Sequence, residues 1–142
     1  MSAHRNPIRG RGASDNPVNR FKKSYIDYEL DEETGEKPSP KTQLIPDNTQ
    51  SVITYNTSED IGFGASINPY RGCEHGCIYC YARPYHEYLG YSSGLDFESK
   101  IVVKYDAPKI LKKELSAKKW KPQVIAMSGV TDVYQPIERE LE

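Results

Sequence analysis

The sequence lacks any long apolar run. Its longest uninterrupted aliphatic stretch, Val124–Met127, is far shorter than the roughly 20 apolar residues that a membrane-spanning helix needs. The first ten residues are polar and contain no apolar core of a secretory signal peptide. These absences predict a protein with no membrane partner, which we expect to be soluble and cytoplasmic.

The sequence also lacks a net charge that would point to a partner. Its 142 residues carry 19 lysines and arginines against 20 aspartates and glutamates, a formal charge of −1. The length is typical of one domain. However, only 37% of the residues are apolar, 27% are charged, and there are ten glycines and ten prolines. This composition predicts that part of the chain lies outside a packed core.

The charge is unevenly distributed, which divides the chain into two parts. Residues 1–23 have six basic residues against one acidic residue, and residues 24–60 have nine acidic against two basic. We expect residues 1–60 to form a poorly ordered polar leader whose opposite charges keep it solvated or fold back on each other. An alternative function for the basic segment is phosphate contact with nucleic acid, through arginines such as Arg9 and Arg11.

Periodic apolar segments begin at residue 61, so residues 61–142 are predicted to be the folded part. Ala65–Asn68 is a strand candidate that Pro69 stops, and a glycine-rich loop follows as far as Gly76. We expect a helix to begin near Ile78.

A second group of elements follows after residue 100. Ile101–Tyr105 is predicted to be a strand, Asp106 to cap a helix, and Val124–Met127 to be a strand buried on both faces. Strand, helix and strand in this order predict a right-handed parallel unit and therefore an α/β fold.

Cysteine is scarce, but its placement is informative. The three thiols of Cys73, Cys77 and Cys80 lie within eight residues in a C-x3-C-x2-C spacing. An odd number cannot pair fully in disulfides, and such clustering is typical of a shared metal centre. Soft thiolates select iron–sulfur clusters, zinc or copper(I). Three thiolates on a four-iron cluster would leave one iron open to a substrate or cofactor.

Two other interpretations of the cysteines compete with the cluster. Zinc could use His75 or His86 as a further ligand, although the chain offers no second CxxC or HxxxH pair of the kind that structural zinc sites use. Three metal-free cysteines would have to crowd into one glycine loop, whereas free cysteines are usually scattered in cores.

The cysteine motif resembles the signature of the radical S-adenosylmethionine superfamily, including the aromatic Tyr79 before the last cysteine. The wider stretch NPYRGCEHGCIYCYAR at 68–83 resembles the subgroup related to spore photoproduct lyase, often described as DNA repair photolyase-like. Segments GRGA at 10–13, NPVNRF at 16–21 and TDVYQPIE at 131–138 support the same resemblance.

The resemblance implies a 4Fe-4S cluster on Cys73, Cys77 and Cys80, with S-adenosylmethionine chelated to the open iron. It implies that a reducing electron donor feeds the cluster, that a 5′-deoxyadenosyl radical forms, and that Tyr79 lies near the adenine. The superfamily's strand-end turn corresponds here to residues 128–132, where no glutamate occupies the usual place. Cofactor contacts are therefore expected from Ser128, Gly129, Thr131 and Asp132.

The resemblance also implies a fold, the beginning of a partial (β/α) barrel. Such a core has about six β/α units of roughly 30 residues each, but only 78 residues remain from Ala65 to the last residue. We therefore expect an amino-terminal fragment of a lyase-like enzyme that does not turn over substrate alone. The alternative function is a non-catalytic zinc-binding or nucleic-acid-binding module.

Overall fold

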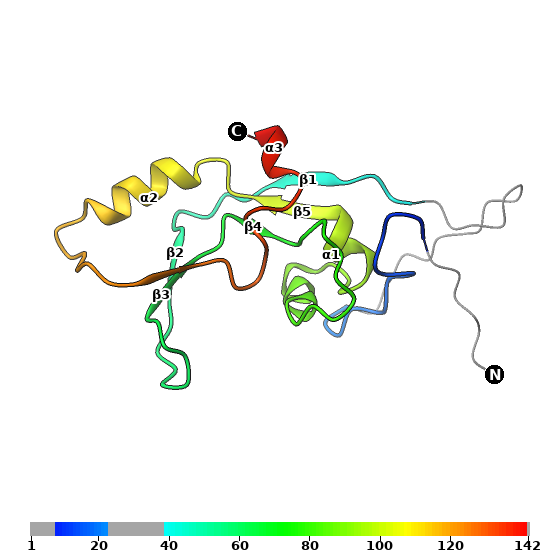
Figure 1. Cartoon of the computed structure of the whole chain (residues 1–142), viewed down its shortest axis with the longest axis horizontal. Helices are drawn as coiled ribbons and strands as arrows, with labels where there is room; N and C mark the ends of the chain where they lie inside the picture. Colours follow the sequence, from blue (N-terminus) through cyan, green and yellow to red (C-terminus); the bar gives the residue numbers. More distant parts are fainter. Residues whose placement is uncertain (1–7, 23–38, 142) are drawn as a thin grey trace, which may run out of the picture.

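The computed structural model describes residues 8–22 and 39–141 and has small helices and strands joined by extended segments (Figure 1). In chain order the elements are β1 (Gln43–Pro46), β2 (Ile53–Tyr55), β3 (Ala65–Ile67), β4 (Tyr70–Arg71), the 3-10 helix η1 (Arg83–Leu89), α1 (Leu95–Ser99), β5 (Lys100–Val103), α2 (Ala107–Leu115), β6 (Ile125–Met127) and α3 (Glu138–Leu141). No helix in these two ranges is both long enough and apolar enough to cross a bilayer.

The strands form two separate three-stranded sheets of mixed direction. In the first sheet the order is β1-β5-β4, with β5 parallel to β1 and antiparallel to β4. In the second the order is β2-β3-β6, with β3 antiparallel to β2 and parallel to β6. Each sheet therefore joins segments that are far apart in the sequence.

Each sheet has its own hydrophobic cluster, covered by a helix. Val52, Ile53, Ala65 and Ile67 pack in the second sheet against Ile110 and Leu111 of α2 and against Trp120. Tyr70, Ile101 and Val103 pack in the first sheet against Ile137 and Leu141 at α3. A third cluster contains Cys73, Ala82 and Phe97 and lies directly beneath the cysteine loop. The candidate site is thus supported by a core of its own.

The expectation of a partial (β/α) barrel is wrong. The predicted strands at 65–68, 101–105 and 124–127 exist as β3, β5 and β6, but β5 and β6 belong to different sheets. The strand, helix and strand after residue 100 therefore do not form one parallel unit, because β5 pairs with β1 from the predicted leader. Within the described residues the fold is a small α/β domain with two mixed sheets.

Two local expectations also fail. Residues after Ile78 form turns, and only at Arg83 does the 3-10 helix η1 begin, with a proline in its first positions. The run at 124–127 is not buried on both faces, since Val124 and Met127 are 75% and 60% exposed. The helix after Asp106 begins at Ala107 as predicted, but no side-chain capping bond from Asp106 forms.

The expectation of a poorly ordered leader is wrong for residues 8–22 and 39–60. Strands β1 and β2 lie in this part and pair with β5 and β3. Ile8, Asn16 and Asn19 are buried although the segment is polar. The remaining charges of the predicted leader, in 1–7 and 23–38, lie outside the described residues.

Candidate metal centre and the turn beside it

The cysteine loop follows β4 and is shaped by two glycines in the left-handed region. Gly72 has φ of +87° and Gly76 has φ of +63°, conformations that other residues rarely adopt. A side chain at Gly72 would also place its Cβ 2.9 Å from the carbonyl oxygen of Phe97. The amide of Cys73 donates to that same carbonyl at 2.9 Å, which ties the start of the loop to α1.

The three cysteines line one cavity of about 160 Å³. Cys73 is buried, whereas Cys77 and Cys80 are half-buried, and all three are free thiols. Burial raises the pKa of the Cys73 thiol, while backbone hydrogen bonds from His75 and Asp132 act in the opposite direction. The amides that oppose the burial effect come from the cysteine loop and from the turn after β6.

The turn after β6 packs directly on the cysteine loop. Gly129, Thr131 and Asp132 line the same cavity as the three thiols. The Thr131 hydroxyl donates to the Gly72 carbonyl at 2.7 Å, and the His75 Nε2 lies 3.3 Å from the Asp132 carboxylate. The hydroxyl of Tyr81 donates to the Gly129 carbonyl. Thus the two segments that the resemblance assigns to cluster and cofactor meet at one site.

A buried glutamine fastens this turn to the loop. Gln135 is 1% exposed, and its side-chain oxygen accepts the Glu74 amide at 3.0 Å. Its side-chain nitrogen donates to the Thr131 hydroxyl at 3.2 Å and lies 3.4 Å from the Gly72 carbonyl oxygen. Gln135 belongs to the segment 131–138 that supports the resemblance, but a lone glutamine carries no spacing signal from which this role could be predicted.

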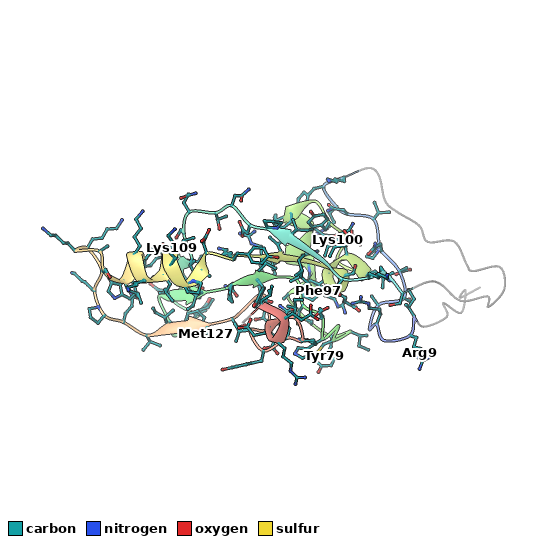
Figure 2. The ribbon with its side chains drawn as sticks, turned by 90° about the horizontal axis from the view of Figure 1, so that it is seen from above. Arg9, Tyr79, Phe97, Lys100, Lys109 and Met127 are labelled. Carbon is teal, nitrogen blue, oxygen red and sulfur yellow. The ribbon has the colours of Figure 1, made fainter. Side chains whose placement is uncertain are left out.

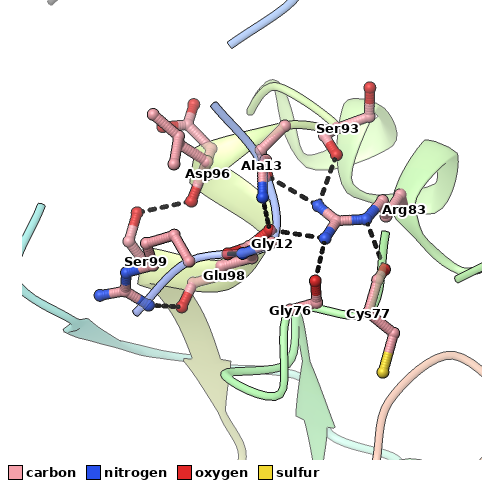
Figure 3. A network of polar contacts seen from close by, with 12 residues as sticks. Gly12, Ala13, Gly76, Cys77, Arg83, Ser93, Asp96, Glu98 and Ser99 are labelled. Atoms are coloured by element: carbon pink, nitrogen blue, oxygen red, sulfur yellow. Dashed lines mark hydrogen bonds and ion pairs between the residues drawn. The ribbon is translucent and has the colours of Figure 1, made fainter. Parts of the chain in front are cut away.

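The loop is held from the other side by a buried ion pair (Figure 3). The guanidinium of Arg83 donates to Glu98 at 2.5 Å, to the Gly76 carbonyl at 2.8 Å and to the Cys77 carbonyl at 3.0 Å. Arg83 is 8% exposed and Glu98 is fully buried. Arg83 therefore fixes the backbone between two cysteines, a role that its charge alone did not predict.

The same carboxylate holds the amino-terminal segment. Glu98 accepts the amides of Gly12 at 2.9 Å and Ala13 at 2.8 Å. Gly12 lies so close to the loop that a Cβ there would be 1.7 Å from the Gly76 carbonyl oxygen. We name residues 8–22 the strap, because they run across the cysteine loop and the 91–99 segment. The strap makes two further hydrogen bonds. The Asn16 side-chain nitrogen donates to the Asp96 carboxylate at 3.0 Å, and the Asp96 amide donates to the Asn16 side-chain oxygen at 2.8 Å.

Two of the predicted cofactor residues lie apart from the thiol cavity. Tyr79 is 86% exposed, does not line the cavity, and lies at the edge of the molecule, whereas Phe97 lies near its middle (Figure 2). Ser128 has φ of +78°, and its amide donates to the carbonyl of Ile67, so it shapes the turn without lining the cavity. Gly129, Thr131 and Asp132 are the predicted residues that the structure brings to the cysteines.

The three thiols share a cavity without converging on one point. No three histidine, cysteine, aspartate or glutamate side chains within 8–22 and 39–141 converge closely enough to hold one metal ion. A tetrahedral zinc site requires such convergence. A four-iron cluster binds each cysteine sulfur through a different iron, so its three ligands need a shared cavity rather than a single meeting point. The soft thiol set and the common cavity therefore fit an iron–sulfur cluster.

The two histidines considered for zinc lie in different places. His75 lines the thiol cavity, whereas His86 lines a separate cavity together with Arg71. His86 is 2% exposed and packs edge-on against Phe97. The structure therefore does not bring His86 to the cysteines.

The chain is similar to uncharacterized proteins of Mycobacterium and Methanocaldococcus species. It is 43% identical over 76 residues to a protein of Mycobacterium bovis and to one of Mycobacterium tuberculosis, a match covering 54% of this chain and 22% of each relative. A protein of Methanocaldococcus jannaschii is 38% identical over 77 residues, covering 54% of this chain and 26% of the relative. The match thus spans about a quarter of these relatives' length. No family profile and no solved structure matches the chain.

Proposed function

We propose that this chain is the cluster-binding part of a radical S-adenosylmethionine enzyme, with Cys73, Cys77 and Cys80 as ligands of a 4Fe-4S cluster. The observation that carries the proposal is the shared cavity, which is lined by all three thiols and by the 129–132 turn. The C-x3-C-x2-C spacing and its flanking residues support it independently. The subgroup resemblance extends the proposal to a lyase of the photoproduct type.

The bound cluster would supply one-electron reduction of S-adenosylmethionine, drawing on an external reducing donor. The chain's own residues set the geometry and electrostatics around it. Gly72 and Gly76 permit the loop to curve around the cavity, and the Arg83 guanidinium holds the Gly76 and Cys77 carbonyls by hydrogen bonds.

The turn offers one side chain for a cationic cofactor group. The Thr131 hydroxyl is already engaged with Gly72 and Gln135. The Asp132 carboxylate is half-exposed at the cavity, beside His75. A carboxylate in this position can accept a hydrogen bond from an ammonium group, so we assign Asp132 the amino group of S-adenosylmethionine.

Anaerobic reconstitution with iron and sulfide tests the ligand set. The wild-type chain should take up four irons and four sulfides and give a reduced cluster whose electron paramagnetic resonance signal changes on adding S-adenosylmethionine. Changing Cys73, Cys77 or Cys80 singly to Ala should abolish the cluster, whereas Ser58→Ala, an exposed position away from the cavity, should not. Stoichiometric zinc without labile sulfide, or an intact cluster in any cysteine variant, would refute the proposal.

The Asp132→Asn variant separates cofactor contact from cluster assembly. It should retain the iron and sulfide content of the wild type but weaken the spectroscopic response to S-adenosylmethionine by about tenfold in concentration, since one charge-assisted hydrogen bond is lost. An unchanged response would remove Asp132 from the cofactor site and leave the cysteine assignment standing.

A further inference from the structure

We propose that a second cavity binds a small aromatic oxyanion, a phosphate monoester or a carboxylate attached to a ring. The cavity has a volume of about 390 Å³, within the usual range of ligand pockets. It lies between β3, β4 and η1 and is separated from the thiol cavity by the loop at Gly72, with Ala82 lining both. Its ligand would therefore lie next to the proposed cluster, but the inference does not depend on that cluster.

The cavity carries two cations and no acidic lining residue. Arg71 and Lys104 line it, together with the polar side chains of Thr54, Ser66 and Asn68, and none of its lining residues is an aspartate or glutamate. The Lys104 ammonium donates to the Ser51 carbonyl at 3.1 Å. The Arg71 guanidinium has neither a hydrogen bond nor an ion pair with any residue that the structure describes. An oxyanion would supply the acceptor that this guanidinium lacks.

The electrostatic environment of Lys104 indicates that the two cations influence each other. Burial lowers the pKa of Lys104, and the charge of Arg71 lowers it further. Asp47 and Glu114 raise it, but these two carboxylates do not line the cavity. Asp47 and Glu114 therefore partly compensate the Lys104 charge from outside the cavity, and the Arg71 guanidinium is the cation that an anionic ligand would pair with.

A third group in the cavity is an unsatisfied histidine. His86 is 2% exposed, and its Nε2 has no hydrogen-bond partner among the residues described. Buried polar atoms of folded proteins are nearly always paired, so this nitrogen is an unsatisfied polar atom of a residue that lines the cavity. Arg71, Lys104 and His86 are thus three basic residues that line the cavity.

The rest of the cavity suits a flat apolar group. Phe97 is 1% exposed and lines the cavity beside His86. Tyr85 and Tyr88 also line it, and both are more than half exposed, so they flank its opening to solvent. Aromatic side chains pack well against a planar ring. The combination of ring surface and paired cations selects an aromatic oxyanion over inorganic phosphate.

The test is a binding titration of the full chain without iron, so failure of cluster assembly cannot affect it. The probes are phenyl phosphate and benzoate, with inorganic phosphate and benzyl alcohol as probes that each lack one half of the ligand. Phenyl phosphate or benzoate should bind at least about tenfold more tightly than inorganic phosphate or benzyl alcohol. The stronger of the two identifies the oxyanion. Equal binding of benzyl alcohol, or no saturable binding, would overturn the proposal.

Variants locate the binding. Arg71→Gln and Lys104→Gln should each weaken phenyl phosphate binding by about tenfold, the loss expected for one charge-assisted hydrogen bond. Lys118→Gln, which removes an exposed lysine away from the cavity, should leave binding unchanged. Equal weakening in all three would show only nonspecific charge attraction and would refute the site.

A nuclear magnetic resonance titration of the wild-type chain does not depend on how the variants fold. The chain has only three histidines, so their ring signals can be assigned separately. Phenyl phosphate should shift the ring signal of His86 and leave that of His75 in place. A shift confined to His75, or no shift of any histidine, would contradict the assignment.

Discussion

Removing the carboxylate of Glu98 should destabilise the protein strongly, because this buried side chain joins three segments. It accepts hydrogen bonds from Arg83 at 2.5 Å, from the Gly12 amide at 2.9 Å and from the Ala13 amide at 2.8 Å. The Glu98→Gln variant keeps the shape but removes the charge and one acceptor. It leaves the buried guanidinium of Arg83 with backbone carbonyls as its remaining partners.

The magnitude follows from the burial of both partners. The side chain of Glu98 is fully buried and that of Arg83 is 10% exposed. Breaking a buried ion pair by removing one partner costs about 3–5 kcal/mol. Against a total stability of about 5–15 kcal/mol for a small domain, the loss is large. With a urea dependence of about 2 kcal/mol per molar, the unfolding midpoint should fall by about 1.5–2.5 M.

Urea unfolding followed by circular dichroism measures this loss. Glu59→Gln is the matched control, since Glu59 is exposed and should change the free energy of unfolding by less than about 0.5 kcal/mol. A double-mutant cycle with Arg83→Met isolates the pair, because the double variant should lose less than the sum of the two single losses. A loss below about 1 kcal/mol for Glu98→Gln, or additive losses in the cycle, would refute the role of the buried pair.

Two further predictions concern the strap and the buried histidine. Gly12→Ala should destabilise the chain by about 1–3 kcal/mol and expose the strap to limited proteolysis, because its Cβ would overlap the Gly76 carbonyl; Gly62→Ala, with open space around it, should do neither. His86 should make stability depend on pH, because burial lowers its pKa to about 4, against partial opposition from Asp96, while the unfolded chain titrates near 6.5. This contribution is complete above about pH 6.5 and is lost as the pH falls towards 4, so urea unfolding at pH 5 should give a stability about 2 kcal/mol lower than at pH 7. His86→Phe should remove this loss of unfolding free energy between pH 7 and pH 5, whereas His75→Phe should retain it. An equal pH dependence of stability in the wild type and both variants would contradict the reasoning.

Local patterns predicted the individual elements better than their partners. The apolar and β-branched runs located β3, β5 and β6, because strand propensity is visible within a few residues. Pairing is not a local property. β5 pairs with β1 rather than lying beside β6, and β1 comes from a segment whose acidic residues and prolines favoured an extended leader.

The cysteines of the site could be predicted from the sequence, but the residues that hold their loop in place could not. The spacing of three thiols in a glycine loop singled out the three cysteines that share the cavity, whereas the predicted Tyr79 and Ser128 do not line it. The groups that hold the loop were not identified, because Arg83, Glu98 and Gln135 act through backbone carbonyls and amides that any sequence provides. Hydrogen bonds of this kind leave no periodic or spaced signal.

The strap alters how the basic charge at the amino terminus should be interpreted. Among its cations, Arg11 donates to the Glu98 and Pro40 carbonyls at 2.8 and 2.6 Å, and Arg20 pairs with the buried Glu87. Two of the four basic residues within 8–22 are therefore committed to internal contacts. A nucleic-acid arm draws its affinity from cations that are free to neutralise phosphates. Because the strap also supplies amides to Glu98 behind the cysteine loop, its best supported role is to hold the cysteine loop in place.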